Sequence, residues 1–469
     1  MAARTSPPKI ETHGYGTLTA AQPLGATAEL VTIEADLTRG LHSFSIVGLP
    51  DKAVEEARDR IAAAIRHSGF KSPKAENRRI ILSLSPADLK KEGSHYDVPL
   101  ALCYLVASGE LALPTTKSLF AGELALDGML RTVRGILPQV VAAQRAGFTS
   151  VFVPPGNVPE ALLARDVAVY APHTLRELID HLAGVAVLPR MERDETVVPP
   201  PLAIDLAHIK GQESAKRALE IAAAGRHNLV LYGPPGTGKT MLARALVGVL
   251  PPLTDDEVLE VTAIHSTAGA LSEGAIFHPP FRSPHHTVSH TAMVGGGAYP
   301  KAGEVTLAHK GVLFLDEFPE FDARTLEALR QPLEDRIVTV ARARATVTFP
   351  ADCMIVAAMN PADTLSADAE VAVRAALKQA RKISRPIADR LDLWIEVPHV
   401  PHEVLAGLSE GEPSSVVRER VRNAREQARI RTKDPNASNA RLSARALEHD
   451  SGFTEAANTA LLAAATKLD

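Results

Sequence analysis

The segment Gly233-Pro-Pro-Gly-Thr-Gly-Lys-Thr240 constrains the fold of this chain more than any other feature. It matches the pattern G-x-x-x-x-G-K-[ST], follows an apolar run over residues 228–232 and precedes a helical pattern over residues 239–249. In a strand–loop–helix unit of this kind, the glycines allow backbone N–H groups to close around phosphate oxygens. The N-terminus of the following helix adds a partial positive charge. The sequence therefore predicts an α/β domain with a phosphate-binding loop.

This loop predicts binding of ATP together with Mg²⁺. Lys239 is expected to bridge the β- and γ-phosphates, and Thr240 is expected to ligate Mg²⁺. The residues expected to contact the nucleotide are Gly233, Pro234, Pro235, Gly236, Thr237, Gly238, Lys239, Thr240 and Met241.

A second motif supplies carboxylates for the same chemistry. The apolar run 312–315 is followed directly by Asp316 and Glu317, as expected for a buried strand that ends in two acidic residues. In phosphate-loop enzymes the first carboxylate holds Mg²⁺ through water, and the second can polarise the attacking water. The alternative is an ordinary apolar strand followed by an acidic turn. A further apolar run, 354–359, ends at Asn360.

Length and composition limit the wider possibilities. The chain has 469 residues, which suggests about three domains at about 150 residues each. It has no apolar run near the length of about 20 residues that a membrane span needs, and no signal peptide is visible. Its two cysteines cannot build a disulfide framework, so we expect a cytoplasmic protein. The net charge of −4 requires any contact with nucleic acid to be local.

Periodicity divides the chain into segments. Residues 10–183 mix strand and helix patterns, and residues 51–70 form the clearest helix, with Asp51 as its N-cap. Residues 184–201 are charged and then proline-rich, which indicates a linker. Residues 202–400 alternate strands and helices around the phosphate loop, and residues 401–469 look helical.

Four stretches together resemble the ComM/YifB family of magnesium-chelatase-like AAA+ proteins: 43–61, 84–102, 280–297 and 303–321. The resemblance covers nearly the whole chain. It implies an N-terminal Lon-protease-like (S5-type) α+β domain, a central AAA+ αβα domain and a partial C-terminal helical lid. It also implies a homo-oligomeric ring, expected to be a hexamer, that moves on DNA at the expense of ATP during natural transformation.

The resemblance also assigns site residues. Asn360 matches the sensor that reads the γ-phosphate, although a strand-ending turn is the alternative. Arg390, in Asp389-Arg390-Leu391, matches the arginine that acts on the ATP of the next subunit, and Arg385 is the second choice. The alternative is a surface ion pair of Arg390 with Asp389 or Asp392. In the Lon-like segment the catalytic lysine position holds Leu137 and the serine position holds His95. We therefore expect a scaffold without peptidase chemistry, with an unusual nucleophile at Ser94 as the alternative.

The sequence departs from the family pattern at two places. The expected cysteines after Asn360 are absent, so zinc is not expected there, and residues 367–382 look like a basic helix. The second-sensor stretch of the family would begin where the chain stops at Asp469. This indicates a chain that is C-terminally truncated within its lid.

DNA contact is predicted at one hairpin. Residues 336–349 alternate apolar and polar residues, and Arg342 and Arg344 fall at a spacing of two, so we expect both on one face, against DNA phosphates. The alternative is an exposed hairpin with solvated arginines. The arginine-rich stretch 414–431 is more typical of a lid helix than of a DNA site. His285, His286 and His290 could bind a metal, but no carboxylate at a familiar spacing supports this.

The sequence thus predicts an ATPase ring that translocates single-stranded or branched DNA, with no membrane contact. Two alternatives stay open. One is a chelatase-like ATPase that remodels a protein partner. The other is a nucleotide-binding form with impaired turnover, which the missing second sensor motivates.

Overall fold

The computed structural model describes twelve parts of the chain: residues 14–75, 77–114, 117–193, 204–271, 274–297, 301–342, 345–360, 383–407, 410–434, 438–443, 446 and 454–466. The chain forms two compact units. Unit 1 comprises residues 1–198 and 255–276, and unit 2 comprises residues 199–254 and 277–469. Among the described residues, no helix is both long enough and apolar enough to cross a membrane.

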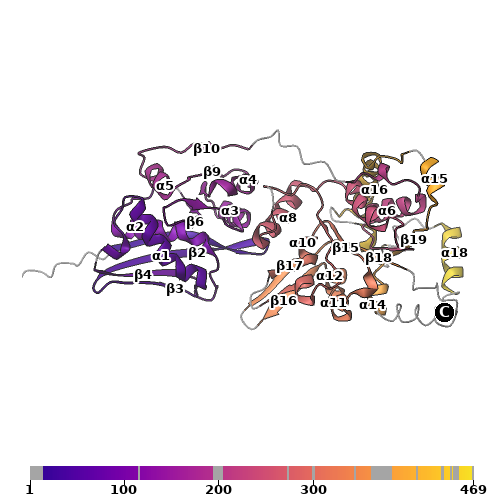
Figure 1. Cartoon of the computed structure of the whole chain (residues 1–469), viewed down its shortest axis with the longest axis horizontal. Helices are drawn as coiled ribbons and strands as arrows, with labels where there is room; N and C mark the ends of the chain where they lie inside the picture. Colours follow the sequence, from indigo (N-terminus) through magenta and orange to yellow (C-terminus); the bar gives the residue numbers. More distant parts are fainter. Residues whose placement is uncertain are drawn as a thin grey trace, which may run out of the picture. The chain divides into compact units, whose positions relative to one another are not determined.

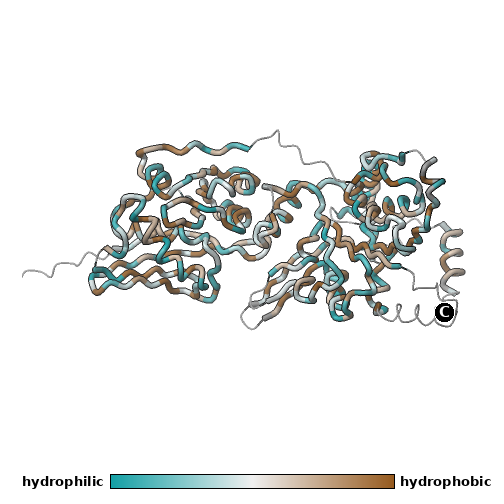
Figure 2. The backbone as a smooth tube through the Cα atoms, viewed as in Figure 1, coloured by the Kyte–Doolittle hydropathy of each residue, from teal (hydrophilic) through white to brown (hydrophobic). Residues whose placement is uncertain are grey.

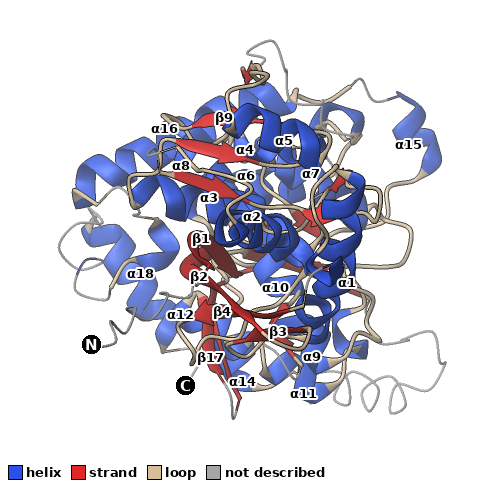
Figure 3. Cartoon of the chain, turned by 90° about the vertical axis from the view of Figure 1, so that its left-hand side faces the viewer, coloured by secondary structure: helices blue, strands red, loops and turns tan. Residues whose placement is uncertain are grey.

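Unit 1 is built first around a four-stranded sheet in the order β1-β2-β4-β3. Its strands are β1 (Gly14–Leu24), β2 (Thr27–Arg39), β4 (Arg78–Ser85) and β3 (Ser43–Val47), and they lie side by side in Figure 3. Helices α1 (Lys52–His67) and α2 (Asp97–Ser108) share one apolar core with this sheet (Figure 1). The predicted helix cap is confirmed, because the Asp51 side chain accepts a hydrogen bond from the Val54 N–H.

A second sheet of unit 1 has the order β10-β9-β8-β5. Its strands are β10 (Arg190–Met191), β9 (Ala168–Tyr170), β8 (Ser150–Phe152) and β5 (Ser118–Phe120). Helix α3 (Ile136–Arg145) packs against it through Ile136 and Val140. Further elements of this unit are α4 (Val158–Ala161), α5 (Leu175–Leu182) and the short pair β6 (Glu123–Leu124) and β7 (Leu130–Arg131).

Helix α8 (Asp255–Ala268) belongs to unit 1 although its flanking residues belong to unit 2. The Ser266 hydroxyl donates to Glu160 Oε2 at 2.5 Å and accepts from the Gly135 N–H at 3.0 Å. Burial raises the pKa of Glu160, and its hydrogen bonds with Ser266 and Asn157 oppose that rise. This helix lies inside the range predicted for the ATPase domain, and its core contacts are with α3, where Ala263 packs against Leu137.

Unit 2 is organised by a five-stranded parallel sheet in the order β12-β15-β18-β11-β19. The strands are β12 (Phe281–Arg282), β15 (Val312–Leu315), β18 (Met354–Met359), β11 (Leu229–Tyr232) and β19 (Leu393–Glu396). Every residue of β15 and β18 is buried, which matches the hydrophobic character of these strands in Figure 2. Such continuous apolar runs are typical of parallel strands covered on both faces. The strands predicted at 228–232, 312–315 and 354–359 are therefore confirmed.

Helices α6 (Glu213–Gly225), α7 (Lys239–Val249) and α16 (Ser414–Thr432) pack with this sheet in one core. In α16, Arg418 donates to the Gly248 carbonyl at the end of α7, and Arg425 donates to the Ala223 carbonyl near the end of α6. Two arginines of the 414–431 stretch therefore contribute to helix packing within unit 2. Other C-terminal helices are α14 (Arg385–Ala388), α15 (His402–Gly407) and α18 (Glu455–Ala465).

The predicted hairpin is confirmed as β16 (Ile337–Arg342) paired antiparallel with β17 (Ala345–Pro350). Shorter elements among the described residues of this unit include α9 (His290–Val294), β13 (Gly295–Gly296), β14 (Lys301–Ala302), α10 (Glu304–Leu307), α11 (Ala323–Glu327) and α12 (Arg330–Asp335).

A buried carboxylate gathers four cations where the hairpin meets β18. Asp352 is only 6% exposed. Its oxygens lie 2.6–3.2 Å from the side-chain nitrogens of Arg226, Lys310, Arg336 and Arg441. Burial acts to raise the pKa of Asp352, but the positive charges of Arg226, Arg441 and Lys310 outweigh it and hold that pKa well below its usual range. One carboxylate therefore ties together the hairpin, the end of α6 and a segment beyond α16.

We expect Asp352→Asn to destabilise unit 2 by about 3 kcal/mol, because it leaves four partly buried cations without their carboxylate. Because the folded pKa is depressed, the stabilisation is complete above the unfolded value of about 3.9 and is lost as the pH falls below it. Urea unfolding followed by fluorescence of Trp394, the single tryptophan of the chain, measures the change. The control is Asp335→Asn at an exposed position; equal stability of the two variants would contradict this role.

Candidate functional site

Three neighbouring strands of the parallel sheet deliver the predicted residues to one edge. The phosphate loop follows β11, Asp316 and Glu317 follow β15, and Asn360 follows β18. Strand β18 lies between β15 and β11, and parallel strands present their carboxyl ends at the same edge. The sheet order therefore brings together residues that are up to 127 positions apart in sequence, as the span from Gly233 to Asn360 shows.

Lys239 is the most enclosed charged group of this edge. Its Nζ donates to the carbonyls of Gly233 at 2.8 Å and Pro234 at 2.7 Å, and to Asn360 Oδ1 at 3.0 Å. Burial lowers the pKa of Lys239, and the Asp316 charge opposes that effect. The predicted sensor residue and the phosphate-loop lysine are thus in direct contact.

Thr240 and Asp316 form the second link across the site. The Thr240 hydroxyl donates to Asp316 Oδ2 at 3.3 Å. A hydroxyl and a carboxylate are the oxygen ligands that Mg²⁺ prefers, and Mg²⁺ at phosphates usually takes only one or two carboxylates and keeps several waters. The absence of any group of three or more His, Cys, Asp or Glu ligands among the described residues is compatible with such a site.

The glycines of the loop leave room for a phosphate chain. Gly236 and Gly238 have φ angles of 78° and 90°, which favour glycine, and a Cβ at either position would meet no atom within 4 Å. Gly233 is constrained differently, because a Cβ there would collide with the Val397 carbonyl. Gly238 directly precedes α7, so the helix N-terminus opens at the loop. The loop, the lysine and the Thr240–Asp316 pair therefore fit a nucleoside triphosphate with Mg²⁺.

Glu317 has a contact that the sequence did not reveal. Its Oε2 lies 2.9 Å from Nδ1 of His286, one of the three histidines considered as metal ligands. The His286 ring also packs against the His285 ring, with centroids 4.2 Å apart. The sequence offered little sign of this contact. His286 follows β12, an edge strand of only two residues, which is too short to identify from sequence.

Arg390 lies at the other end of the strands from its own phosphate loop. Its backbone carbonyl accepts from Asn228 Nδ2, directly before β11, and its guanidinium lies 3.4 Å from Glu334 Oε1. The alternative surface pairing with Asp389 or Asp392 is replaced by this pair with Glu334. Within one chain the structure does not bring Arg390 to the site, so its action on a neighbouring subunit stays a prediction.

Other predicted sites fall partly outside the described residues. Arg344 and the side chain of Arg342 are not described, nor is the basic stretch 367–382.

In unit 1, Leu137 is fully buried in α3. Burial lowers the pKa of His95 to about 4, and its Nε2 lies 3.1 Å from the Ala21 carbonyl.

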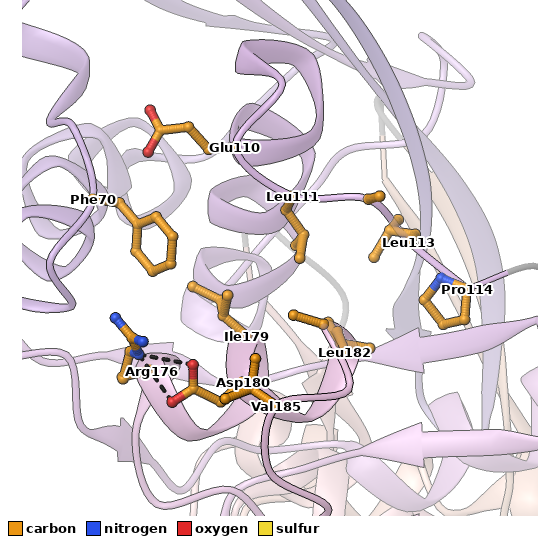
Figure 4. A pocket seen from close by; sticks show the side chains of 12 residues that line it. Phe70, Glu110, Leu111, Leu113, Pro114, Arg176, Ile179, Asp180, Leu182 and Val185 are labelled. Atoms are coloured by element: carbon orange, nitrogen blue, oxygen red, sulfur yellow. Dashed lines mark hydrogen bonds and ion pairs between the residues drawn. The ribbon is translucent and has the colours of Figure 1, made fainter.

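Unit 1 also carries an open hollow of about 550 Å³ beside α5 (Figure 4). Leu111, Leu113 and Ile179 are among the apolar side chains that line it, and Arg176 pairs with Asp180 at its edge. The third charged residue of the lining is Glu110.

Comparison with known sequences agrees with this geometry. The family description "Magnesium chelatase, subunit ChlI" matches residues 205–405, and "Subunit ChlI of Mg-chelatase" matches residues 33–157. The chain is 42% identical over 440 residues to "Competence protein ComM" of Haemophilus influenzae, covering 91% of this chain and 84% of that protein. It is 43% identical over 420 residues to "Uncharacterized protein YifB" of Salmonella typhimurium, covering 88% and 82%.

A partial similarity concerns the Lon-like segment. "Lon protease 2" of Bacillus subtilis is 34% identical over 140 residues, which are 28% of this chain and 25% of that protein. The chain has a mixed α/β fold, with a parallel sheet in unit 2. Its match to the magnesium-chelatase family model supports an ATPase assignment. With similarity that spans most of both chains, this protein belongs to the ComM/YifB family of magnesium-chelatase-like AAA+ proteins.

Proposed function

We propose that this protein is an ATP-hydrolysing, ring-forming AAA+ motor that acts on DNA. The observation that carries the ATPase part is the pair of links across the site: Lys239 Nζ to Asn360 Oδ1 at 3.0 Å, and Thr240 to Asp316 at 3.3 Å. Together they join the phosphate loop to the two strands that carry the acidic pair and the sensor. Family membership supports the same conclusion.

Each residue of the site has its own role in ATP hydrolysis. The loop N–H groups and Lys239 hold the phosphates, and Thr240 and Asp316 would hold Mg²⁺. When bound, Mg²⁺ supplies charge neutralisation at the phosphate oxygens. Glu317 accepts the proton of the attacking water. Asn360, already in contact with Lys239, reports whether the γ-phosphate is present.

Assembly into a ring completes the site in this proposal. Arg390 lies at the opposite end of the sheet strands from its own loop, and its side chain is about half exposed. An exposed arginine in this position suits contact with the nucleotide of a second copy. A hexamer is the expected ring.

The DNA substrate is supported by a relative and by the hairpin. A relative that is 42% identical carries the name "Competence protein". The β16–β17 hairpin is anchored at its base by Arg336 and Asp352, and its far end carries Arg342. We further propose that unit 1 forms the Lon-like domain without a Ser–Lys pair, and that the ATPase core and its lid lie in unit 2.

Lys239→Ala is expected to remove ATP binding and hydrolysis together. Glu317→Gln is expected to keep ATP binding and to lower kcat by about 10²- to 10⁴-fold, the usual contribution of a general base. Steady-state phosphate release and fluorescent-nucleotide titration separate the two effects. Hydrolysis by Glu317→Gln at the wild-type rate would contradict the assignment.

Arg390→Ala is expected to bind ATP normally but to lose about 10³-fold or more in hydrolysis. A mixture of Arg390→Ala and Lys239→Ala subunits should hydrolyse ATP faster than either variant alone. The Arg390→Ala subunits supply an intact phosphate loop, and the Lys239→Ala subunits supply Arg390. Arg385→Ala serves as the comparison, since it tests the second candidate arginine in the same mixture. No recovery in the mixture would contradict action between subunits.

Single-stranded or forked DNA is expected to stimulate hydrolysis, and the combined change Arg342→Glu and Arg344→Glu is expected to abolish the stimulation while sparing the DNA-free rate. Because phosphate contacts release counterions, stimulation should weaken as salt is raised. The combined change Arg342→Gln and Arg344→Gln is the control for an effect on the fold of the hairpin. Hydrolysis that no DNA changes would contradict the DNA motor and favour remodelling of a protein partner.

A further inference from the structure

We propose that Asn228 is a positioning residue for Arg390, which fixes the backbone from which the arginine reaches the ATP of a neighbouring subunit. The proposal rests on the function proposed above, in which Arg390 acts between subunits. Its basis is the hydrogen bond of 2.9 Å from Asn228 Nδ2 to the Arg390 carbonyl, which joins residues 162 positions apart in sequence.

Sheet topology explains why Asn228 reaches this turn. Asn228 directly precedes β11, whose first residue, Leu229, lies opposite Val356 in β18 and Leu393 in β19. Parallel strands begin at the same edge of a sheet, so the residue before β11 lies beside the segments that lead into both neighbours. Arg390 comes two residues after α14 ends and three residues before β19 begins.

Each polar group of Asn228 has a partner. Its Nδ2 donates to the Arg390 carbonyl, and its Oδ1 accepts from the Ile355 N–H of β18 at 2.8 Å. Its backbone N–H donates to Asp392 Oδ2 at 3.0 Å, and its carbonyl accepts from the Leu393 N–H at 3.1 Å. A carbonyl only accepts and an N–H only donates, so the two partners of the amide fix which way it faces. Three of these bonds hold the start of β19 and the turn before it against the start of β11.

The backbone of Arg390 is held on both sides. Its N–H donates to the Ile387 carbonyl at 3.0 Å, and its carbonyl accepts from Asn228. Ile387 and Leu391 are buried in one apolar core, which anchors the turn around Arg390. Packing and hydrogen bonds of this kind set where a functional side chain starts. The side chain of Arg390 is about half exposed, so its guanidinium stays free to contact a second subunit.

This arrangement has a consequence for the rate of hydrolysis. A catalytic group that is displaced by about 1 Å can lose about 10²-fold in rate. Loss of the Asn228 amide N–H frees the Arg390 carbonyl and leaves the contacts of Lys239 in place. The loss should therefore fall on hydrolysis at the neighbouring subunit, and the subunit that carries the change should still bind ATP.

The variant Asn228→Asp removes this one bond. An aspartate has almost the same shape, and one of its oxygens still accepts from the Ile355 N–H, but the other cannot donate to the Arg390 carbonyl. We expect Asn228→Asp in the full chain to lower kcat by about 10- to 100-fold with unchanged affinity for ATP. Phosphate release and fluorescent-nucleotide titration measure the two quantities. Asn228→Ala should show the same defect, which excludes an effect of added charge beside Asp392.

Mixed rings test the route of the effect. In the mixture of Arg390→Ala and Lys239→Ala subunits, the arginine comes from the Lys239→Ala subunits. Asn228→Asp should lower the recovered rate by about 10-fold or more when these subunits carry it. It should leave the recovered rate unchanged when the Arg390→Ala subunits carry it. A role of Asn228 in the fold of its own phosphate loop predicts the opposite order, because the Arg390→Ala subunits supply the loop.

The outcomes separate the two proposals. A mixture of Arg390→Ala and Lys239→Ala subunits that shows no recovery overturns the action of Arg390 between subunits, and the role of Asn228 falls with it. When this mixture recovers, the positioning role alone is overturned by either of two results. One is an unchanged rate with Asn228→Asp in the Lys239→Ala subunits. The other is a rate that falls at least as much when the Arg390→Ala subunits carry the change.

Discussion

The parallel pairing of β11, β18 and β15 is the constraint on which the candidate site depends. Each strand ends in a different chemical group: the phosphate loop, Asn360, and the pair Asp316 and Glu317. Parallel pairing requires a crossover between strands, so these groups come from distant sequence and still meet at one edge. Continuous burial of β15 and β18 fixes the strands on both faces. The contacts of Lys239 with Asn360 and of Thr240 with Asp316 follow from that register.

Two features connect this edge to the rest of the chain. At the start of β18, Asp352 holds four cations, including Arg336 before the hairpin and Arg441 beyond α16. Such a cluster is costly to break, because loss of the Asp352 carboxylate would leave four partly buried cations uncompensated. Between α7 and β12, the chain contributes α8 to unit 1, where Ser266 and Glu160 anchor it. The chain therefore passes from α7, the helix after the phosphate loop, to β12, the strand before His286, by way of a helix that belongs to unit 1.

Much of the fold could be predicted because its signals are local. The Asp51 cap, the strand before Gly233 and the buried run before Asp316 each depend on residues within one turn or strand, and the structure confirms them. The hairpin was also visible as an alternating pattern. Strand β12 was not, because two residues carry no periodicity. The place of α8 was not either, because a helical pattern does not specify which core the helix packs into.

The chemical groups of the site and their order along the chain can be identified from the sequence alone. The glycine pattern, the acidic pair and the asparagine are residue types whose chemistry requires no neighbour to be recognised. Which of these groups are in contact depends on the folded chain. It pairs Glu317 with His286, places Arg390 away from its own loop and gives Asp352 four cations. The physical reason is that such contacts depend on strand order and burial, which arise when distant segments pack and which no single stretch encodes.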